Sequence, residues 1–213
     1  MLDLNHTEAA ELFRKTEHPW EVLPLISDFI IEYGSRLSAD EYTEVSEHVW
    51  IHKTAKVFPS AYIAAPCIIG PRTEVRHCAF IRGSAFVGAD CVVGNSTELK
   101  NVILFDNVQV PHYNYVGDSI LGYKSHMGAG SITSNVKSDK KNVNVHFEDG
   151  DIETGRKKFG AILGDNVEVG CGSVLNPGTV IGRNTNVYPL SSVRSAVSAD
   201  SIYKKQGEVA GKR

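Results

Sequence analysis

Aliphatic residues recur at every sixth position over a long central stretch of this chain. The first run has nine members: Ile51, Val57, Ile63, Ile69, Val75, Ile81, Val87, Val93 and Leu99. An α-helix repeats about every 3.6 residues and a β-strand about every 2, so neither explains this period. The spacing is typical of the hexapeptide repeat of a β-helix, in which each six-residue rung forms one flat side and three rungs complete a coil.

The repeat continues beyond Leu99 with two shorter steps. Its next positions are Leu104, Val110, Val116, Leu121, Met127 and Thr133. The five-residue steps begin at Leu99 and Val116, and rotation through three sides places both of these residues on the same side. We therefore expect the two short rungs to stack on one another, which keeps the coil in register.

The repeat stops after Asn135 for about 26 residues. In this insertion, at about residues 136–158, apolar residues alternate before Asp149-Gly150, which predicts a β-hairpin. The six-residue spacing then resumes at Leu163, Val169, Leu175, Ile181, Val187 and Val193. The whole pattern predicts a β-helix domain over residues 49–195.

The two ends of the chain differ from the repeat. Residues 1–48 have apolar residues at helical spacing, with Thr7 as a helix cap, a second helix opening at Pro19 and a third short helix starting at Ser38. We expect a helical cap that covers one end of the coil or packs on a neighbouring subunit. Residues 196–213 are mostly polar and predict a poorly ordered tail.

Composition narrows the class of protein. The net charge of -3 gives no reason to expect a nucleic-acid partner. No apolar run approaches the ~18 residues of a membrane span, and the first residues have neither the basic start nor the apolar core of a signal peptide. The 4 cysteines show no zinc or CxxC spacing, so we expect reduced thiols packed as small hydrophobic groups in a cytoplasmic protein.

Two cations occupy equivalent positions of successive coils. In a coil of three six-residue rungs, positions eighteen apart lie one above the other at the strand spacing of about 4.8 Å. Arg82 and Lys100 are such a pair. They form either a solvated face or a phosphate clamp, since Arg binds phosphate with two hydrogen bonds and Lys adds a point charge.

A second column runs through His112. With the two short rungs counted, its members are His77, Asn95, His112, Ala129, Cys171 and Pro189. The backbone of Ala129 thus lies one rung from His112, between two glycines that let a ligand approach the main chain. The Arg82–Lys100 pair lies nearby on the adjacent side, so His112 is a candidate functional residue.

These residues occur in motifs of one known family. The motifs are Arg82, Asn95-Ser-Thr-Glu-Leu-Lys100, His112-Tyr-Asn-Tyr115-Val-Gly-Asp, Gly128-Ala-Gly-Ser-Ile-Thr-Ser-Asn135 and Lys158-Phe-Gly-Ala-Ile-Leu-Gly-Asp165. Over roughly residues 50–195 the chain resembles the acetyltransferase domain of bacterial bifunctional N-acetylglucosamine-1-phosphate uridyltransferases. The hand of the coil is what this resemblance implies. The expected fold class is therefore all-β, a left-handed parallel β-helix with a short N-terminal helical segment.

The resemblance also implies an activity and roles for single residues. The family acetylates glucosamine 1-phosphate with acetyl-CoA, without a metal, as a homotrimer with active sites between subunits. His112 corresponds to its general base. The Ala129 N–H would face the thioester carbonyl, and Cys171 and Pro189 would line the acetyl-CoA groove. Contacts to the amino sugar or its phosphate are implied for Arg82, Lys100, Tyr115, Asn135 and Lys158.

The chain departs from the family in several ways. The nucleotidyltransferase domain is absent, so we expect no uridylyltransferase activity and consider a separate nucleotidyltransferase as a partner. His126 and Val136 replace a family asparagine and tyrosine, which leaves the exact acyl acceptor open. The insertion is additional to the family pattern and places Lys158 at the end of a mobile loop.

Other interpretations stay open. One is a catalytically idle hexapeptide domain that binds a sugar nucleotide or a partner enzyme, and another is an acyltransferase for a different amino sugar or nucleotide sugar. A third is a β-helix metal enzyme with three converging histidines. His77, His112 and His126 are candidates for that site, but they lack the local spacing of that class.

Overall fold

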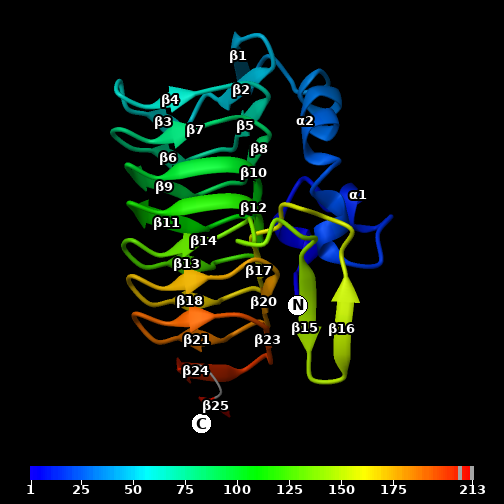
Figure 1. The fold of residues 1–213 in the computed structure, drawn as a ribbon. Helices are drawn as coiled ribbons and strands as arrows, with labels where there is room; N and C mark the ends of the chain where they lie inside the picture. Colours follow the sequence, from blue (N-terminus) through cyan, green and yellow to red (C-terminus); the bar gives the residue numbers. More distant parts are fainter. Residues whose placement is uncertain (206–207, 212–213) are drawn as a thin grey trace.

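The structure is a computed structural model that describes residues 1–205 and 208–211. Its main body is a parallel β-helix whose coils stack from the N-terminal strands at the top of Figure 1 to the C-terminal strands at the bottom. The predicted fold class, an all-β, left-handed parallel β-helix with a short N-terminal helical segment, is confirmed.

The coil has three sides, here called A, B and C. Side A consists of β4 (Tyr62–Ile63), β7 (Phe80–Ile81), the first parts of β10 (Glu98–Leu104) and β12 (Tyr115–Leu121), β14 (Ile132–Thr133), β19 (Val174–Leu175) and β22 (Ser192–Val193). Side B consists of β2 (Val49–His52), β5 (Cys67–Ile69), β8 (Ala85–Val87), the last parts of β10 and β12, β17 (Ala161–Leu163), β20 (Thr179–Ile181) and β23 (Ala196–Val197). Side C consists of β3 (Lys56–Val57), β6 (Glu74–Val75), β9 (Val92–Asn95), β11 (Gln109–His112), β13 (His126–Met127), β18 (Glu168–Val169), β21 (Asn186–Val187) and β24 (Ser201–Lys205).

The two long strands β10 and β12 pass from side A to side B without a break. Leu99 pairs with Val116 and Leu104 with Leu121, so the two five-residue rungs stack on one another, as the repeat predicts. Leu121 in turn pairs with Leu163. The coil therefore resumes on side B after the insertion and keeps its phase.

The repeat positions point into the coil and form its core. From Ile69 to Val193 every one of them is buried. In the first coil, Ile51, Val57 and Ile63 are half-buried, because no further coil covers them. The six-residue period thus marks the residue of each rung whose side chain points into the coil.

The outward residues of side B are apolar too, so the coil has a second core outside it. They are Trp50, Ile68, Phe86, Ile103, Ile120, Ile162 and Val180, each at most 6 % exposed. The covering elements are η1 (Leu4–His6), α1 (Ala10–Phe13), η2 (Pro19–Val22) and α2 (Ile26–Gly34), drawn in blue in Figure 1. Ring contacts such as Phe29 with Phe86 hold them. Because a fully buried large apolar side chain contributes roughly 1.5–3 kcal/mol, this contact fixes the helices on the coil.

The N-terminal segment differs from the expectation in two respects. It covers side B of its own coil and not one end, because the apolar outward column that needs cover runs along that side. The expected third helix at Ser38 is absent. Instead β1 (Tyr42–Ser46) pairs antiparallel with β2, where the edge of the first coil would otherwise be unpaired.

The expected hairpin is present in the insertion. Strands β15 (Asn144–Phe147) and β16 (Gly150–Glu153) pair antiparallel. Phe147 faces Gly150, so the turn is Glu148-Asp149, one residue earlier than expected. The hairpin lies below the helices in Figure 1 and contacts β20 and β23 on side B.

The chain beyond Val193 continues the coil. β23 pairs with β20, β24 pairs with β21, and β25 (Glu208–Gly211) turns back antiparallel to β24. The expectation of a poorly ordered tail is therefore wrong for residues 196–205 and 208–211, because further strand pairing was available at the end of the coil. The rest of that expectation, residues 206–207 and 212–213, lies outside the described residues.

Candidate functional site

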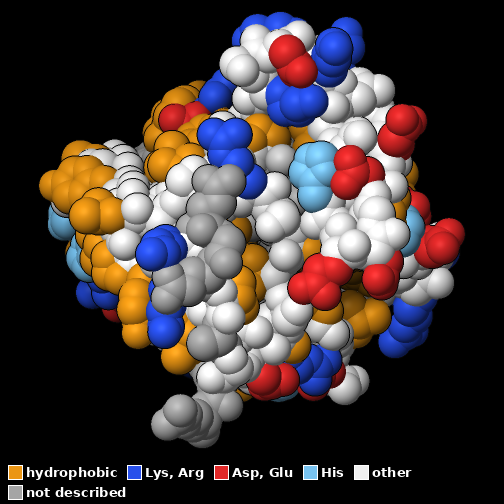
Figure 2. Space-filling view, turned by 60° about the horizontal axis from the view of Figure 1, so that its bottom comes forward, with side chains coloured by type: hydrophobic (Ala, Val, Ile, Leu, Met, Phe, Trp, Pro, Cys, Tyr) orange, Lys and Arg blue, Asp and Glu red, His pale blue; other side chains and the backbone are white. Residues whose placement is uncertain are grey.

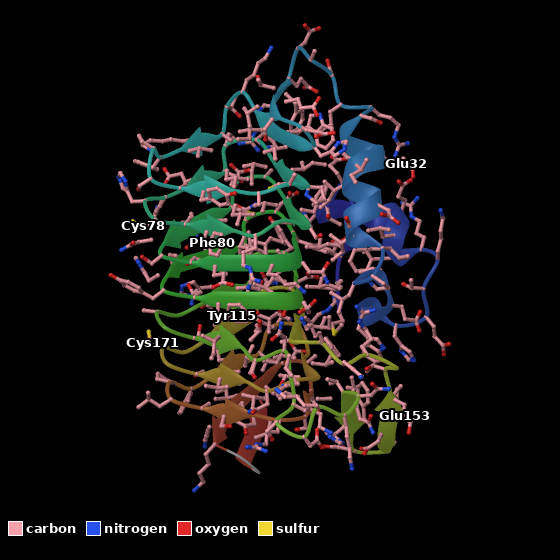
Figure 3. All side chains as sticks on the ribbon, turned by 45° about the horizontal axis from the view of Figure 1, so that its top comes forward. Glu32, Cys78, Phe80, Tyr115, Glu153 and Cys171 are labelled. Carbon is pink, nitrogen blue, oxygen red and sulfur yellow. The ribbon has the colours of Figure 1, made fainter. Side chains whose placement is uncertain are left out.

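The predicted column forms the corner between sides C and A. The Gly130 N–H donates to the His112 carbonyl (3.0 Å), the Gly172 N–H to the Ala129 carbonyl (2.9 Å) and the Leu190 N–H to the Cys171 carbonyl (2.9 Å). Ala129, Cys171 and Pro189 therefore stack in turn on His112, one coil apart. In Figure 3, Cys78 and Cys171 lie along this corner and Tyr115 lies on side A.

His112 is held through its main chain and leaves its ring exposed. Its N–H donates to Asn114 Oδ1 (3.1 Å), and Asn114 Nδ2 donates to the carbonyls of Gly128 (2.9 Å) and Ser131 (3.1 Å). Asn114 is buried. It thus fixes the His112 rung to the segment that contains Ala129. No imidazole hydrogen bond is present among the described residues, so both ring nitrogens can serve a ligand.

The main chain at Ala129 is open to a ligand. Ala129 is exposed, and its N–H has no partner within residues 1–205 and 208–211. A Cβ at Gly128 would meet the Cys171 nitrogen at 2.7 Å. Gly130 has φ +69°, the left-handed region that glycine adopts without strain. Both glycines are therefore needed to present this N–H at the corner.

On side A, a buried carboxylate gathers the predicted substrate residues. Asp118 is 2 % exposed and accepts hydrogen bonds from Lys100 Nζ (2.9 Å), Asn101 Nδ2 (2.9 Å) and Asn135 Nδ2 (2.6 Å). Asn135 also donates to the Tyr115 hydroxyl (3.1 Å). Burial raises the pKa of Tyr115, and the Asp118 charge raises it further. The structure thus brings Lys100, Tyr115 and Asn135 together around Asp118.

Arg82 joins this surface from the coil above. Its Nη1 donates to Glu98 Oε1 at 2.8 Å. The two stacked cations are therefore each paired with a carboxylate, Arg82 with Glu98 and Lys100 with Asp118. Sequence reasoning missed both acids. The coil that contains Lys100 is one residue short, so Lys100 pairs with Gly117 across the strands and Asp118 follows one position later.

Lys158 follows the insertion and its side chain is exposed. The chain next to it is fixed, because the Phe159 N–H donates to the Asn135 carbonyl (3.0 Å) and the Gly160 N–H to the Asp118 carbonyl (2.8 Å). The Phe159 ring is fully buried and lies 5.8 Å from Trp20. The expectation that Lys158 ends a mobile loop is therefore wrong at this end of the insertion.

A groove of about 370 Å³ runs along side C beside the same corner. Its lining is mostly apolar and includes Gly128, Val169, Cys171, Val187, Tyr188 and Pro189. His126 lies at its rim, where Nδ1 meets Glu168 Oε2 at 2.8 Å. Such a lining suits the pantetheine arm of a coenzyme A thioester, which is long, narrow and mostly apolar.

Exposed apolar side chains flank the groove. Tyr113 is 61 % exposed, Tyr188 47 % and Leu190 85 %. Figure 2 shows hydrophobic side chains gathered at the left edge of the molecule, the edge where Figure 3 places Cys171. This corner therefore carries apolar surface on both sides of the His112 column.

The cysteines divide into two pairs. All are free thiols; Cys67 and Cys91 are buried, whereas Cys78 and Cys171 are exposed at the corner. Burial raises the pKa of the Cys91 thiol to about 12. Packing as a small hydrophobic group is thus right for two of them and wrong for the other two, because Cys78 and Cys171 lie at the exposed corner that follows the side C strands.

The described residues bear on two of the other interpretations. No three His, Cys, Asp or Glu side chains within residues 1–205 and 208–211 lie close enough to hold a metal ion. Over the same residues, no helix has both the length and the apolar character needed to cross a membrane.

This chain is similar in sequence to known proteins. The model of the GMPPB C-terminal domain family matches residues 63–181. A bifunctional protein GlmU from Methanococcus maripaludis (strain C5) is 34 % identical over 199 residues, which are 92 % of this chain and 48 % of the relative. A bifunctional sugar-1-phosphate nucleotidylyltransferase/acetyltransferase from Sulfurisphaera tokodaii is 26 % identical over 189 residues, 87 % of this chain and 47 % of the relative. This chain thus spans about half the length of these curated relatives.

A solved structure supports the fold. A hexapeptide transferase family protein from Anaplasma phagocytophilum superimposes with a TM-score of 0.51 at 15 % identity, over 78 % of this chain and 80 % of that chain. At this level of identity the likeness concerns the β-helix alone.

Proposed function

The chain belongs to the family of the GMPPB C-terminal domain, and from this premise we propose that it is an acetyl-CoA-dependent N-acetyltransferase for an amino-sugar phosphate. Glucosamine 1-phosphate is the acceptor that its residues suit best. The observation that carries the proposal is the corner where the His112 ring and the unpartnered Ala129 N–H lie one coil apart.

These groups suit acyl transfer from a thioester. His112 takes a proton from the amine as its nitrogen forms a C–N bond to the acetyl carbon, and the C–S bond then breaks and releases the coenzyme thiol. General base catalysis of this kind contributes typically 10²–10⁴-fold. The Ala129 N–H donates to the oxygen that becomes negative in the tetrahedral intermediate, a contact worth about 3–4 kcal/mol. The two groups lie on adjacent coils, so the spacing between coils sets the distance between them.

The side A residues suit the sugar phosphate. Arg82, Lys100 and Lys158 supply positive charge, and Tyr115 and Asn135 supply a hydroxyl and an amide for the sugar or its phosphate. Asp118 holds Lys100 and Asn135 in place through hydrogen bonds to both. Several relatives bear the name of the bifunctional protein GlmU, which supports an amino-sugar phosphate of UDP-N-acetylglucosamine synthesis.

The groove on side C suits acetyl-CoA as the co-substrate. Cys171 and Pro189 contribute to its apolar wall, and Gly128 leaves room above them. Glycine at this position brings the coils close enough for the thioester to reach Ala129. We assign the pantetheine arm to this groove.

The proposed assembly is a cytoplasmic homotrimer. Side B is covered by the chain's own helices and hairpin, so sides A and C remain for contact between subunits. The apolar corner at Tyr113 and Leu190 favours closed cyclic packing, which buries such surface. Light scattering that gives the mass of one chain would contradict this assembly and a site between subunits.

Thiol release from acetyl-CoA tests the reaction. The purified protein is mixed with acetyl-CoA and glucosamine 1-phosphate, free thiol is followed with a chromogenic disulfide, and the acetylated sugar is identified by mass spectrometry. We expect both products in equal amounts. If the wild-type protein releases thiol no faster than the His112→Ala variant does, the proposed acetyltransferase activity is refuted.

An idle domain that binds a sugar nucleotide is the second candidate. One observation favours it: His126 at the groove rim is engaged by Glu168 (2.8 Å), where the resembling family has asparagine. Binding of UDP-N-acetylglucosamine by calorimetry without any thiol release would support this candidate over the first.

A further inference from the structure

Arg156 is a cation that the structure leaves without a partner. It follows the hairpin, where its N–H donates to Thr154 Oγ1 (3.2 Å) and its carbonyl accepts from the Val143 N–H (2.7 Å). Its Nε is buried and unbonded. No hydrogen bond or ion pair of its guanidinium occurs in residues 1–205 and 208–211. A buried donor without an acceptor costs free energy and calls for an explanation.

The charge that acts on Arg156 is that of Asp118. Burial lowers the pKa of Arg156, and the Asp118 charge opposes this effect. Asp118 is not a free partner, because it already accepts from Lys100, Asn101 and Asn135. The charge of Arg156 is therefore additional to the Lys100 charge that Asp118 already pairs.

The segment after Arg156 is tied to that cluster. Two residues beyond Lys158, the Gly160 N–H donates to the Asp118 carbonyl (2.8 Å), and Phe159 is buried against Trp20. A Cβ at Gly160 would lie 2.3 Å from the Gly117 carbonyl oxygen, so only glycine permits this approach. The position of Arg156 is thus set by a fixed end of the insertion. In Figure 3 the chain returns to the coil from Glu153 on β16.

The charge balance of the site indicates what Arg156 is for. Arg82 is neutralised by Glu98 and Lys100 by Asp118. These pairs orient their cations but contribute little net charge towards a phosphate dianion. An unpaired guanidinium adds a full positive charge, and it offers two parallel donors that match phosphate oxygens.

We propose that Arg156 binds the phosphate group of the acyl acceptor, as a further cation that the insertion adds, besides Lys158, to the Arg82–Lys100 surface. This inference rests on the proposed function for the identity of the acceptor. It gives the insertion a role, since the hairpin fold determines where residue 156 returns to the coil.

The test compares Arg156→Gln, Arg156→Lys and the control Lys157→Gln. Lys157 is the adjacent exposed cation, so the control changes the net charge equally. The kcat/KM is measured for glucosamine 1-phosphate and for glucosamine, which lacks the phosphate. We expect Arg156→Gln to lose roughly 10- to 100-fold on the phosphorylated acceptor and less than threefold on glucosamine. Arg156→Lys should recover part of the loss.

Calorimetric titration with glucosamine 1-phosphate separates failure of this inference from failure of the proposed function. Suppose that the wild-type protein releases no thiol, but that the Arg156→Gln variant binds the sugar phosphate more weakly than the wild-type protein does. The proposed activity is then wrong, and the proposed anion site stands. If Arg156→Gln and Lys157→Gln behave alike in both assays, the inference is refuted. Thermal melting checks folding, and a melting temperature equal to or above wild type is expected, because the unpaired buried group is removed.

Discussion

The Gly130 N–H donates to the His112 carbonyl at 3.0 Å, and this contact between adjacent coils sets the distance between His112, the proposed base, and Ala129, the proposed oxyanion donor. His112→Ala should lower kcat by roughly 10²–10⁴-fold and leave stability unchanged, since the ring is exposed. Steady-state thiol release and thermal melting check this prediction. His77→Ala is the matched control, because it removes a histidine from the same column two coils away. A rate within threefold of wild type for His112→Ala would exclude it as the base.

Asn114→Ala tests the link between His112 and Ala129. The change removes the acceptor of the His112 N–H and the donor to the Gly128 carbonyl. It leaves buried groups unpaired, which should lower the free energy of unfolding by about 1–3 kcal/mol. Urea unfolding measures this. Asn142→Ala, at an exposed position of the insertion, should change neither stability nor rate, and equal effects of the two variants would contradict the assigned role.

Alkylation of Cys171 should block the coenzyme groove. In a Cys78→Ser background, iodoacetamide should modify Cys171 and abolish most activity, and acetyl-CoA should slow the reaction. The buried thiols should not react in the folded protein, and burial raises the pKa of Cys91 to about 12, so little thiolate forms there. Peptide mass spectrometry identifies the modified site. If the protein alkylated at Cys171 keeps full activity, the groove is not the binding site of the coenzyme.

The Arg72–Asp90 pair predicts a pH dependence of stability. Arg72 Nε and Nη2 donate to the two carboxylate oxygens (2.7 and 2.6 Å), and the hydrogen bond from Arg72 lowers the pKa of Asp90. The contribution is therefore present above the unfolded pKa of about 3.9 and is lost as the pH falls through the lower folded pKa. Both side chains are well exposed (60 % and 37 %), so solvent screens the pair and its contribution to stability is small.

The Asp90→Asn variant measures the contribution of the Arg72–Asp90 ion pair to stability. Asparagine tolerates the positive φ of 55° at this position. Urea unfolding at pH 7 should show a lower free energy of unfolding for the variant than for the wild-type protein. As the pH falls through the lowered pKa of Asp90 in the folded protein, the variant and the wild-type protein should converge, because the carboxyl protonates. A deficit that persists or grows in acid would show that the pair acts through packing and not through charge.

Phe159→Ala should loosen the insertion from the coil. A large-to-small change at this fully buried ring should cost about 3–5 kcal/mol and raise KM for the phosphorylated acceptor, because Lys158 and Arg156 then lose their fixed position. Phe147→Ala at the half-exposed hairpin tip serves as control. Hydrogen exchange of residues 156–160 should increase only in the first variant.

The repeat made most of the coil predictable. A period of six fixes which residues point inward, and counting the two short rungs was enough to stack Ala129, Cys171 and Pro189 on His112. The same count misjudged the chain after Val193, where β23 and β24 extend the coil with little aliphatic signal. Strand pairing there depends on the coil above, which composition does not reveal.

The acids and Arg156 show where sequence reasoning reached its limit. Lys100 pairs with Gly117 across the strands, so counting puts Asp118 one position further along and predicts neither its ion pair with Lys100 nor its burial. The insertion has no period, and nothing in it indicates that residue 156 returns to Asp118. Its position depends on Trp20 packing on Phe159, a contact between segments that are far apart in the chain.

The paired short rungs limit how this coil can change in length. A residue lost from one rung rotates every later side chain out of phase unless the adjacent coil loses a residue at the same corner. Leu99 to Leu104 and Val116 to Leu121 are such a matched pair of losses. The 136–158 insertion avoids the constraint, because it replaces the end of the side A rung that Thr133 opens and returns in phase on side B, where Leu163 pairs with Leu121. Variation in length should therefore occur either as neighbouring deletions or as whole excursions, and single-residue deletions inside one rung should abolish folding.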